Sequence, residues 1–472
     1  MATLDAVVVG SGPNGLAAAI TLARAGLSVH ILEAEPTIGG AARSLELTLP
    51  GFAHDIGSAI HPFAYASPFF RQLPLEQHGL SWIHSPAALA HPFVDAPPAF
   101  LEDSVEETAR GLGADGGRYR ALFAPASRAW RGLLLQKQFL PVARHAFTVA
   151  RLGLASLRSA EAFIKNNFRG AKARALMAGS AAHSMLPLDK AATAAVALGL
   201  TISGHACGWP FPRGGAQKLS DALASYFQSL GGTVETGFRV TDLNQIPPAR
   251  AILLDLTPGQ VLAIARDQLP ARYARLLSHY RYGMAAFKMD WALSDPVPWR
   301  SAELRRAATV HIGGTFEEIA ASERAAWSGP PAERPFIICA QHTLFDASRA
   351  PTGKHTLWAY CHVPHASAVD MADRIERQIE RFAPGFRDTI LARSALPPSA
   401  LERRNANLVG GDILGGMQDV WQVFMRPTFR YYSTPLPNVY ICSASTPPGA
   451  GVHGMCGYFA ARVALKKTFR LR

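Results

Sequence analysis

The residues Ala6-Val-Val-Val-Gly10-Ser-Gly12-Pro13-Asn14-Gly15 decide the fold of the N-terminal region. The apolar run before Gly10 is typical of a strand that is buried on both faces. Gly10 permits a tight turn, Gly12 lets the backbone approach a pyrophosphate, and Gly15 allows the following helix to pack closely on the strand. The N-terminus of that helix offers free N–H groups and a partial positive charge. This order of elements predicts a dinucleotide-binding unit in which Pro13 and Asn14 also belong to the binding loop.

The second strand ends in an acidic residue at the spacing that ribose binding requires. Val29-His-Ile-Leu32 is followed by Glu33, about 20 residues past the glycines, where a carboxylate accepts both ribose hydroxyls. Gly39, Gly40 and Arg43 follow, and the extended pattern is that of the glutathione-reductase-like flavoproteins. It predicts FAD as the cofactor. We expect Arg43 to face a cofactor phosphate, although an ordinary surface arginine is the alternative.

The chain has one such glycine pattern, so no separate nicotinamide domain is expected. Electrons taken up by the flavin would leave to a quinone, to oxygen or to a protein carrier. We also assign Val240, Gly451 and Val452 to the cofactor site.

Length and composition limit the organisation of the chain. At 472 residues it is too long for one core, so we predict two intertwined domains. The FAD-binding domain would combine residues 1–75, 205–266 and 411–472, and the substrate-binding domain residues 76–204 and 267–410. Residues 76–204 are Ala/Leu-rich and are expected to be mainly helical. Strands are expected at residues 285–293, 309–312, 336–340 and 356–362. The fold class is α/β, with a Rossmann-like domain and a mixed sheet-and-helix domain.

The charge balance and the cysteines exclude several classes of function. A net charge of +12 suits an anionic partner, but the sequence has no zinc-finger spacing and no aromatic RNA-binding motif. Nucleic acid is therefore not expected. The five cysteines are odd in number and form no CxxC pair, so neither a disulfide framework nor a metal site is predicted. A reducing compartment, the cytoplasm, is expected.

Membrane attachment, if any, is expected to be peripheral. No stretch reaches about 18 uninterrupted apolar residues, and no secretory signal precedes the first strand. Within residues 131–175, however, basic residues recur every seven positions: Lys137, Arg144, Arg151, Arg158, Lys165 and Lys172. Two hypotheses stay open, a solvated helical face or an interfacial segment resting on anionic lipid at the inner face of a membrane.

Three residues are candidates for catalysis. Strand alternation puts Lys288 on a face of small residues, from which it could reach a flavin-bound water or simply pair with Asp290. His61 and His453 are the histidines expected nearest to the isoalloxazine, and the alternative for each is a histidine satisfied by local hydrogen bonds. Serine hydrolase chemistry has no support, because a GxSxG elbow is missing.

Several motifs resemble those of the phytoene desaturase-like FAD-dependent oxidoreductases. They are Gly10–Gly15 with Gly39-Gly40, Gly208-Trp-Pro-Phe-Pro-Arg-Gly-Gly215, Tyr282-Gly283 through Lys288-Met-Asp-Trp-Ala-Leu293, Pro298-Trp299, Thr309-Val-His-Ile-Gly-Gly314 and Gly410-Gly-Asp-Ile-Leu-Gly-Gly416. The resemblance covers almost the whole chain and implies an FAD domain built from separated segments. The chain also resembles, more distantly, the flavin amine oxidases, in which a strand lysine contacts the flavin through water. Lys288 is the nearest match to that lysine.

One departure limits what the resemblance implies. The C-terminal loop reads Thr446-Pro447-Pro448-Gly449-Ala450-Gly451, where the family usually has Thr-His-Pro-Gly-Gly-Gly, and His453 replaces a common Met. FAD binding tolerates this change, but carotenoid desaturation cannot be inherited by name. The leading hypothesis is dehydrogenation of an apolar, isoprenoid or lipid-like substrate. The alternatives are amine oxidation and a non-catalytic flavoprotein that binds a partner or a membrane, and the oligomeric state stays open.

Overall fold

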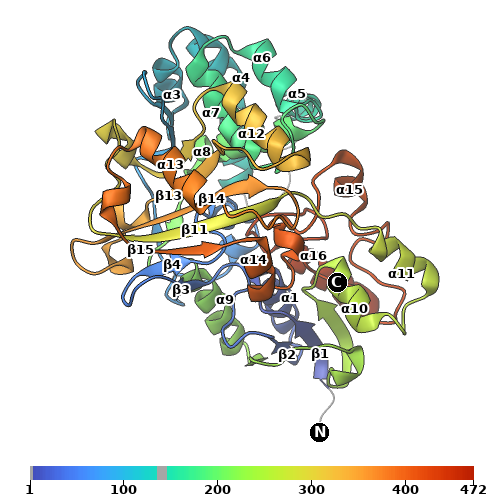
Figure 1. Ribbon diagram of the computed structural model, residues 1–472. Coiled ribbons are helices and arrows are strands. Elements are labelled where there is room, and N and C mark those ends of the chain that lie inside the picture. The colour runs from blue at the N-terminus through green and yellow to red at the C-terminus, as the bar shows by residue number, and fades with distance from the viewer. Residues whose placement is uncertain (1–3, 136–145, 472) are drawn as a thin grey trace.

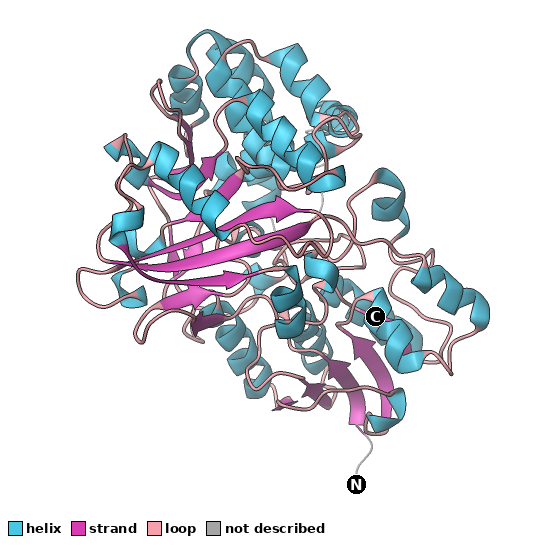
Figure 2. Ribbon diagram, viewed as in Figure 1, coloured by secondary structure: helices cyan, strands magenta, loops and turns pink. Residues whose placement is uncertain are grey.

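A computed structural model describes residues 4–135 and 146–471. Two sheets organise it. A five-stranded parallel sheet lies at the bottom of Figure 1, and a seven-stranded mixed sheet lies above it, beneath a layer of helices. Figure 2 shows the two groups of strands and the helices around them.

The parallel sheet has the order β16-β10-β1-β2-β9. Its strands are β1 (Leu4–Val9), β2 (Val29–Leu32), β9 (Thr233–Glu235), β10 (Ala249–Leu254) and β16 (Val439–Ile441). Segments far apart in the sequence therefore meet in one sheet, with Val9 beside Leu254 and Leu32 beside Glu235. Because all five strands run the same way, their carboxyl ends form one edge, where ligands bind in open α/β sheets.

Helices cover both faces of this sheet. They are α1 (Pro13–Ala23), α9 (Gln217–Ser229) and α16 (Met455–Ala464) on one face, and α10 (Pro258–Ala265) and α11 (Ala271–Ser278) on the other. Contact between α1 and α16 depends on a glycine. A Cβ on Gly457 would lie 1.8 Å from the carbonyl oxygen of Asn14, so no larger residue fits there. The two helices that follow β1 and β16 thus pack tightly side by side.

The mixed sheet has the order β15-β11-β14-β13-β12-β6-β7. Its strands are β6 (Ala87–His91), β7 (Ala99–Glu102), β11 (Ala285–Leu293), β12 (Ala307–Ile312), β13 (Ile337–Ala340), β14 (His355–Val363) and β15 (Ile390–Leu396). The register aligns Lys288 with Tyr360 and Ile338, and Asp290 with Trp358 and Ala340. These rows lie on the same face of the sheet.

Helices also pack on this sheet. One face is covered by α3 (Val105–Gly111), α4 (Gly116–Leu135), α5 (Ala146–Ser156), α6 (Ala160–Asn167), α7 (Ala171–Ala182), α8 (Thr193–Cys207) and α12 (Phe316–Ser328). The opposite face packs against α13 (Ala372–Phe382). Short elements complete the fold: α2 (Pro62–Tyr65), α14 (Pro398–Arg404), α15 (Val420–Met425) and the strand pairs β3 (Ser44–Glu46) with β4 (Ala53–Asp55) and β5 (Trp82–Ile83) with β8 (Phe211–Pro212).

Residues 76–204 are mainly helical, as expected, but they also contain β6 and β7, which supply one edge of the mixed sheet; their short Ala-rich runs imitate a helix in sequence. One expectation needs correction: the described basic residues spaced by seven do not lie on one helical face. Arg151, Arg158 and Lys165 lie on α5, in the following turn and on α6, and Lys172 lies on α7. Lys137 and Arg144 fall outside the described residues. No helix within 4–135 or 146–471 is long and apolar enough to cross a bilayer.

Candidate active site

A cavity of about 430 Å³ runs from the carboxyl edge of the parallel sheet to the helix-covered face of the mixed sheet. Its first end is lined by the N-terminal loop, Glu33 and Val240. Its second end is lined by apolar side chains and Lys288. A long cavity with one polar and one apolar end suits an extended dinucleotide with a substrate beyond it.

The glycine loop forms the first end with its backbone. Gly10 has a φ of +99°, which favours glycine, and a Cβ on Gly15 would lie 2.0 Å from the carbonyl oxygen of Gly10. Gly12 precedes α1 and lines the cavity with Pro13 and Asn14. The side-chain oxygen of Asn14 is buried and has no hydrogen-bond partner among the described residues. The helix N-terminus and this amide therefore face the space that a diphosphate would fill.

Glu33 directly follows β2, as predicted, and hydrogen bonds fix its carboxylate to the glycine loop. Its Oε2 accepts hydrogen bonds from the N–H and the hydroxyl of Ser11, at 2.8 and 2.5 Å, and its Oε1 accepts from the N–H of Glu35 at 2.9 Å. Glu33 also lines the cavity, as Val240 does. The carboxylate thus joins the glycine loop to β2, and its position remains that of a ribose acceptor.

Asp255 is a residue of this end that sequence reasoning missed. It directly follows β10, and its Oδ2 accepts the N–H of Gly15 at 2.9 Å. Burial raises the pKa of Asp255 to about 7, although the hydrogen bond from Gly15 opposes the rise. A carboxyl group under a diphosphate loop is better tolerated in its neutral form, because two negative charges would otherwise lie close together. A polar residue at the end of a parallel strand was the available signal.

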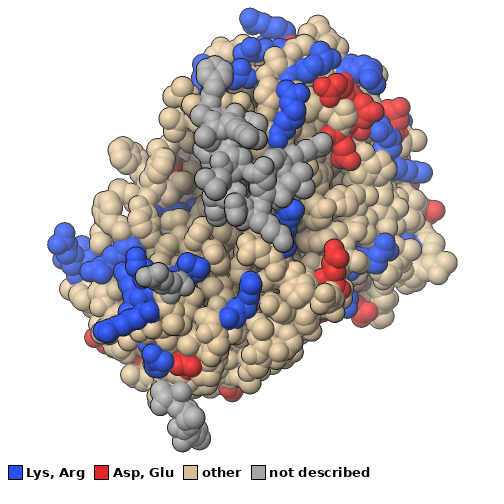
Figure 3. All heavy atoms as spheres, turned by 180° about the vertical axis from the view of Figure 1, so that it is seen from behind, with Lys and Arg blue, Asp and Glu red and all other residues tan. Residues whose placement is uncertain are grey.

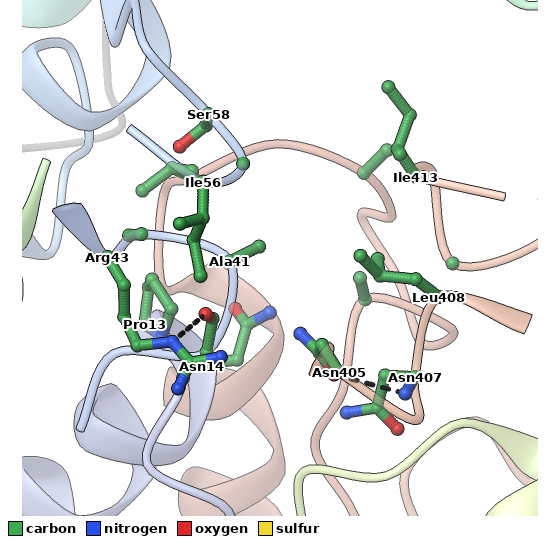
Figure 4. A pocket seen from close by; sticks show the side chains of 18 of the residues that line it. Pro13, Asn14, Ala41, Arg43, Ile56, Ser58, Asn405, Asn407, Leu408 and Ile413 are labelled. Carbon is green, nitrogen blue, oxygen red and sulfur yellow. Dashed lines mark hydrogen bonds between the residues drawn. The ribbon is translucent and has the colours of Figure 1, made fainter. Parts of the chain in front are cut away.

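Arg43 packs among backbone groups. Its guanidinium donates to the carbonyl oxygens of Gly40 and Arg404, both at 2.9 Å, and lies 3.5 Å from the carboxylate of Glu35. Figure 4 shows it beside Pro13 and Asn14 at the wall of the cavity, and it is 3% exposed. Arg43 therefore braces the loop that contains Gly39 and Gly40, and its predicted contact with a phosphate stays a prediction.

The loop of residues 405–408 forms the wall of the cavity opposite Asn14, and sequence reasoning did not assign this loop to the site. Asn405 faces Asn14 across the cavity in Figure 4, and Asn407 lies beside Asn405. The side chain of Asn407 accepts the N–H of Thr257 at 2.8 Å and donates to the carbonyl oxygen of Asp255 at 2.8 Å. This loop follows α14, and its role depends on tertiary contacts alone.

The two candidate histidines lie in different surroundings. His61 lines the cavity, and its Nε2 lies 2.8 Å from the hydroxyl of Ser58. His453 is not among the residues that line the cavity, although Gly451 and Val452 are. Its Nδ1 accepts the N–H of Met455 at 3.0 Å, so it caps the start of α16. Burial lowers the pKa of both histidines to about 4, which leaves them neutral at pH 7.

Lys288 lines the cavity at the point where its polar and apolar ends meet. Its ammonium group is 3% exposed and forms an ion pair with Asp290. Burial lowers the pKa of Lys288 and raises that of Asp290 to about 6, while their mutual attraction opposes both shifts. The structure shows the pairing of Lys288 with Asp290, and contact of Lys288 with a flavin-bound water stays a prediction.

His54 extends this buried network. Its Nδ1 lies 3.6 Å from Asp290 Oδ1, and neither atom has a hydrogen-bond partner among the described residues. Its Nε2 lies 2.7 Å from the hydroxyl of Thr48, which is partly exposed. Titratable side chains thus lead from Lys288 toward the surface.

A second buried ion pair lies next to the first. Asp55 ends β4 and pairs with Arg349 at 2.5 Å, and both are 1% exposed. Its other oxygen accepts from the hydroxyl of Ser44 and the N–H of Ala216, at 2.6 and 2.8 Å. Burial alone would raise the pKa of Asp55, but the charges of Arg349 and His342 and the hydrogen bonds from Arg349 and Ser44 together outweigh it and hold the pKa below its usual range. The pair joins β4, α9 and the loop before β14.

Apolar and neutral side chains line the second end beyond Lys288. They include Leu200, Trp209, Ala286, Ile338, Ala340, Trp358 and Tyr360. The rings of Trp358 and Tyr360 lie 5.2 Å apart at 73°, an edge-to-face pair. His183 also lines this end, and burial lowers its pKa to about 3, so it is neutral. The carboxylates that line the cavity, Glu33, Glu35 and Asp255, lie at the first end.

These features fit FAD. Gly12 and Gly40 approach so closely that a Cβ on Gly40 would lie 3.1 Å from Gly12 Cα, and the loops leave backbone and the Asn14 amide for a diphosphate. The fold and the site define a flavin-dependent oxidoreductase.

The family assignment follows from the sequence. The family described as Flavin containing amine oxidoreductase matches residues 14–455, so the chain belongs to this family. The chain is 25% identical to pyridine nucleotide-disulfide oxidoreductase domain-containing protein 2 of Rattus norvegicus, over 98% of this chain and 93% of that protein. It is 27% identical to a phytoene dehydrogenase of Streptomyces griseus, over 86% and 80%, and 23% identical to a carotenoid 3,4-desaturase of Haloarcula japonica, over 95% of both. The resemblance drawn from the motifs is confirmed.

Solved structures show the same fold. An oxidoreductase from Methanosarcina mazei superposes with a TM-score of 0.65 at 17% identity, over 98% of this chain and all of that one. Putrescine oxidase with bound putrescine superposes with a TM-score of 0.60 at 17% identity, over 99% and 98%. The predicted fold class is confirmed. The protein is an FAD-dependent oxidoreductase of the amine oxidase and phytoene desaturase superfamily.

Proposed function

We propose that the protein dehydrogenates an apolar, isoprenoid-like or lipid-like substrate and passes the electrons to a quinone or to oxygen. One observation carries this proposal: the cavity beyond Lys288 is lined by apolar and neutral side chains, and its carboxylates lie at the opposite end. An apolar substrate gains free energy there by leaving water, about 25 cal/mol for each Å² buried. The names of the two relatives called phytoene dehydrogenase and carotenoid 3,4-desaturase support the same substrate class.

Lys288 is the candidate proton acceptor for this reaction. Dehydrogenation removes a hydride and a proton from neighbouring carbons, and bound FAD supplies the hydride acceptor. Lys288 lines the cavity, and burial lowers its pKa, which favours a role as the proton acceptor. Asp290 is paired with Lys288 and would stabilise the ammonium that results.

Amine oxidation is the competing function, and the family description favours it. A protonated amine would lack a carboxylate partner among the described residues at the second end. Trp358 and Tyr360 neighbour each other edge to face, so they do not form two facing walls around a cation. A non-catalytic flavoprotein is the remaining alternative.

The test is the anaerobic visible absorbance of the purified FAD-bound protein. We expect a detergent-dispersed apolar lipid extract to bleach the flavin bands and a panel of primary amines to leave them unchanged. Bleaching by amines alone would replace the proposal with amine oxidation. Flavin bands that neither reductant bleaches would favour a non-catalytic role.

A matched pair of variants locates the substrate. Leu408 lines the cavity and packs against the apolar cluster of the second end that contains Trp358 and Tyr360, whereas Leu391 is 47% exposed on β15. We expect Leu408→Glu to retain FAD but to lose bleaching by lipid, because a carboxylate in this end must be desolvated. Leu391→Glu should behave as the unchanged protein. Equal bleaching by both variants would contradict an apolar substrate in this cavity.

A further inference from the structure

Three aromatic side chains on one short segment are unusually exposed. Trp421 and Phe424 lie on α15 and Phe429 follows it, with exposed fractions of 74%, 64% and 71%. We call these three residues the aromatic platform. Single exposed apolar residues are normal, but three large aromatic rings within nine positions form a patch of the kind that marks an interaction site.

The segment that carries the platform is firmly held. Arg426 is 1% exposed and donates hydrogen bonds to the carbonyl oxygen of Gly415 at 3.2 Å and to the side chain of Gln418 at 3.1 Å. The carboxylate of Asp419 caps α15 by accepting the N–H of Gln422 at 3.1 Å. Because its inner side is fixed by these contacts, the outward side presents the rings as a defined surface.

Positive charge borders the platform. Arg272 and Arg275 are exposed on α11, and Arg430 is exposed directly after Phe429. Burial raises the pKa of Tyr273 on α11 and the charge of Arg430 opposes the rise, so Arg430 lies beside α11. We call Arg272, Arg275 and Arg430 the basic rim. Lys and Arg side chains predominate at the left edge of Figure 3, where α11 lies in this turned view.

We propose that the aromatic platform and the basic rim dock this protein on an anionic lipid bilayer. Aromatic rings favour the interface between water and hydrocarbon, and arginines beside them pair with anionic headgroups. A second copy of the chain fits the aromatic platform less well than a bilayer does. A symmetric dimer would bring the basic rim against its own copy, and like charges there repel.

The chain connects the docked surface to a wall of the cavity. Ile413, Leu414 and Gly415 line the cavity, and the same segment leads into α15 at Val420. This part of the inference rests on the proposed function, since only an apolar substrate would need delivery from a bilayer. Docking there would bring the membrane next to a wall of the cavity.

The basic residues that recur every seven positions within residues 131–175 provide the control for this proposal. Arg151, Arg158 and Lys165 are exposed there, on another part of the molecule, and Lys165 pairs with Glu161 at 2.6 Å. These three residues carry the same charge as the basic rim. Reversing either set changes the net charge equally, so only the position differs.

The experiment is flotation of the FAD-bound protein with vesicles of mixed phosphatidylcholine and phosphatidylglycerol, or of phosphatidylcholine alone. We expect flotation with the mixed vesicles. The variant Trp421→Ser/Phe424→Ser/Phe429→Ser should bind about tenfold more weakly or worse, because it loses the inserted rings. Arg272→Glu/Arg275→Glu/Arg430→Glu should bind at least about a hundredfold more weakly. Arg151→Glu/Arg158→Glu/Lys165→Glu should float as the unchanged protein does.

Several outcomes would overturn the proposal. They are a wild-type protein that stays at the bottom, platform and rim variants that float normally, or a loss confined to the Arg151 set. A serine variant that turns a dimer into a monomer by sedimentation would assign the platform to a second copy instead. The flavin spectrum of each variant reports its fold. Flotation needs no turnover, and flavin bleaching by detergent-dispersed lipid needs no bilayer, so the two proposals fail separately.

Discussion

The two ends of the cavity are built in different ways. At the first end, glycines and helix N-termini bring backbone groups to the ligand, as the Gly10 turn and the close approach of Gly12 to Gly40 illustrate. At the second end, side chains from strands far apart in sequence meet, and two buried ion pairs, Asp55–Arg349 and Lys288–Asp290, lie beside the cavity.

The difference shows where sequence variation is tolerated. A backbone site requires only that side chains stay out of the way, so a few glycines preserve it. A side-chain site with buried charges requires every partner, because removing one leaves an uncompensated charge. Substitutions at the second end should therefore cost more free energy than substitutions at the first, and four predictions test this order.

Arg349→Leu should give the largest effect. It leaves the Asp55 carboxylate buried without its cation, and we expect a loss of about 3–5 kcal/mol in the free energy of unfolding, measured by urea denaturation. Arg377→Leu, which breaks an exposed pair with Asp373, should cost only about 0–1 kcal/mol. Because the pKa of Asp55 is depressed in the folded protein, its contribution is present above about pH 4 and is lost as the pH falls. An equal loss of unfolding free energy in Arg349→Leu and Arg377→Leu would show that the buried pair stabilises the protein no more than the exposed one.

Lys288→Met should slow flavin reduction by about a hundredfold, or about 2.7 kcal/mol in the barrier, because the proton acceptor beside the substrate is lost. The measurement is the anaerobic stopped-flow rate with the bleaching substrate. Lys288→Arg keeps the charge for Asp290 but is a poor proton acceptor, so it should be slow as well while unfolding like the unchanged protein. A normal rate in Lys288→Arg would assign Lys288 to ion pairing alone.

Gly15→Ala should cost about 1–3 kcal/mol and abolish FAD retention on gel filtration, because its Cβ would meet the carbonyl oxygen of Gly10. Gly117→Ala, inside α4 with open space around it, should be neutral or stabilising by about 0.5–1 kcal/mol. Full FAD retention in Gly15→Ala would contradict the view that the first end depends on close backbone packing.

Asp255→Asn should give an effect that depends on pH and that is smallest near pH 4, where the side chains of both proteins are mostly neutral. The folded protein holds the pKa of Asp255 at about 7, above the ordinary value of about 3.9, so the folded state binds more protons between these values. Stability of the FAD-free protein should therefore fall as the pH rises from about 4 to about 7, by up to about 1.4 kcal/mol per pH unit. The variant should lose this slope in urea denaturation. A slope that persists unchanged would assign it to other groups.

Sequence reasoning succeeded where a local pattern states a backbone requirement. Gly10, Gly12, Glu33 and Val240 lie at the first end of the cavity, and the alternation in residues 285–293 placed Lys288 and Asp290 on one face. It failed where partners are remote in sequence: Asp255 and Asn407 belong to the site only because β10 and the loop after α14 meet there. The short strands β6 and β7 were missed because Ala-rich runs of four or five residues lack a distinctive period.

By itself, the sequence determined the class of protein, since the spacing of glycines and an acid after a buried strand states how the backbone must turn to hold a dinucleotide. Tertiary structure alone decided three things: that Arg349 neutralises Asp55, that His453 caps α16 while His61 reaches the cavity, and that the three rings of the aromatic platform are exposed. The physical reason is the distance along the sequence over which each effect acts. Backbone geometry is set by neighbours within a few residues, whereas buried charge, burial and surface patches depend on which distant segments the fold brings together.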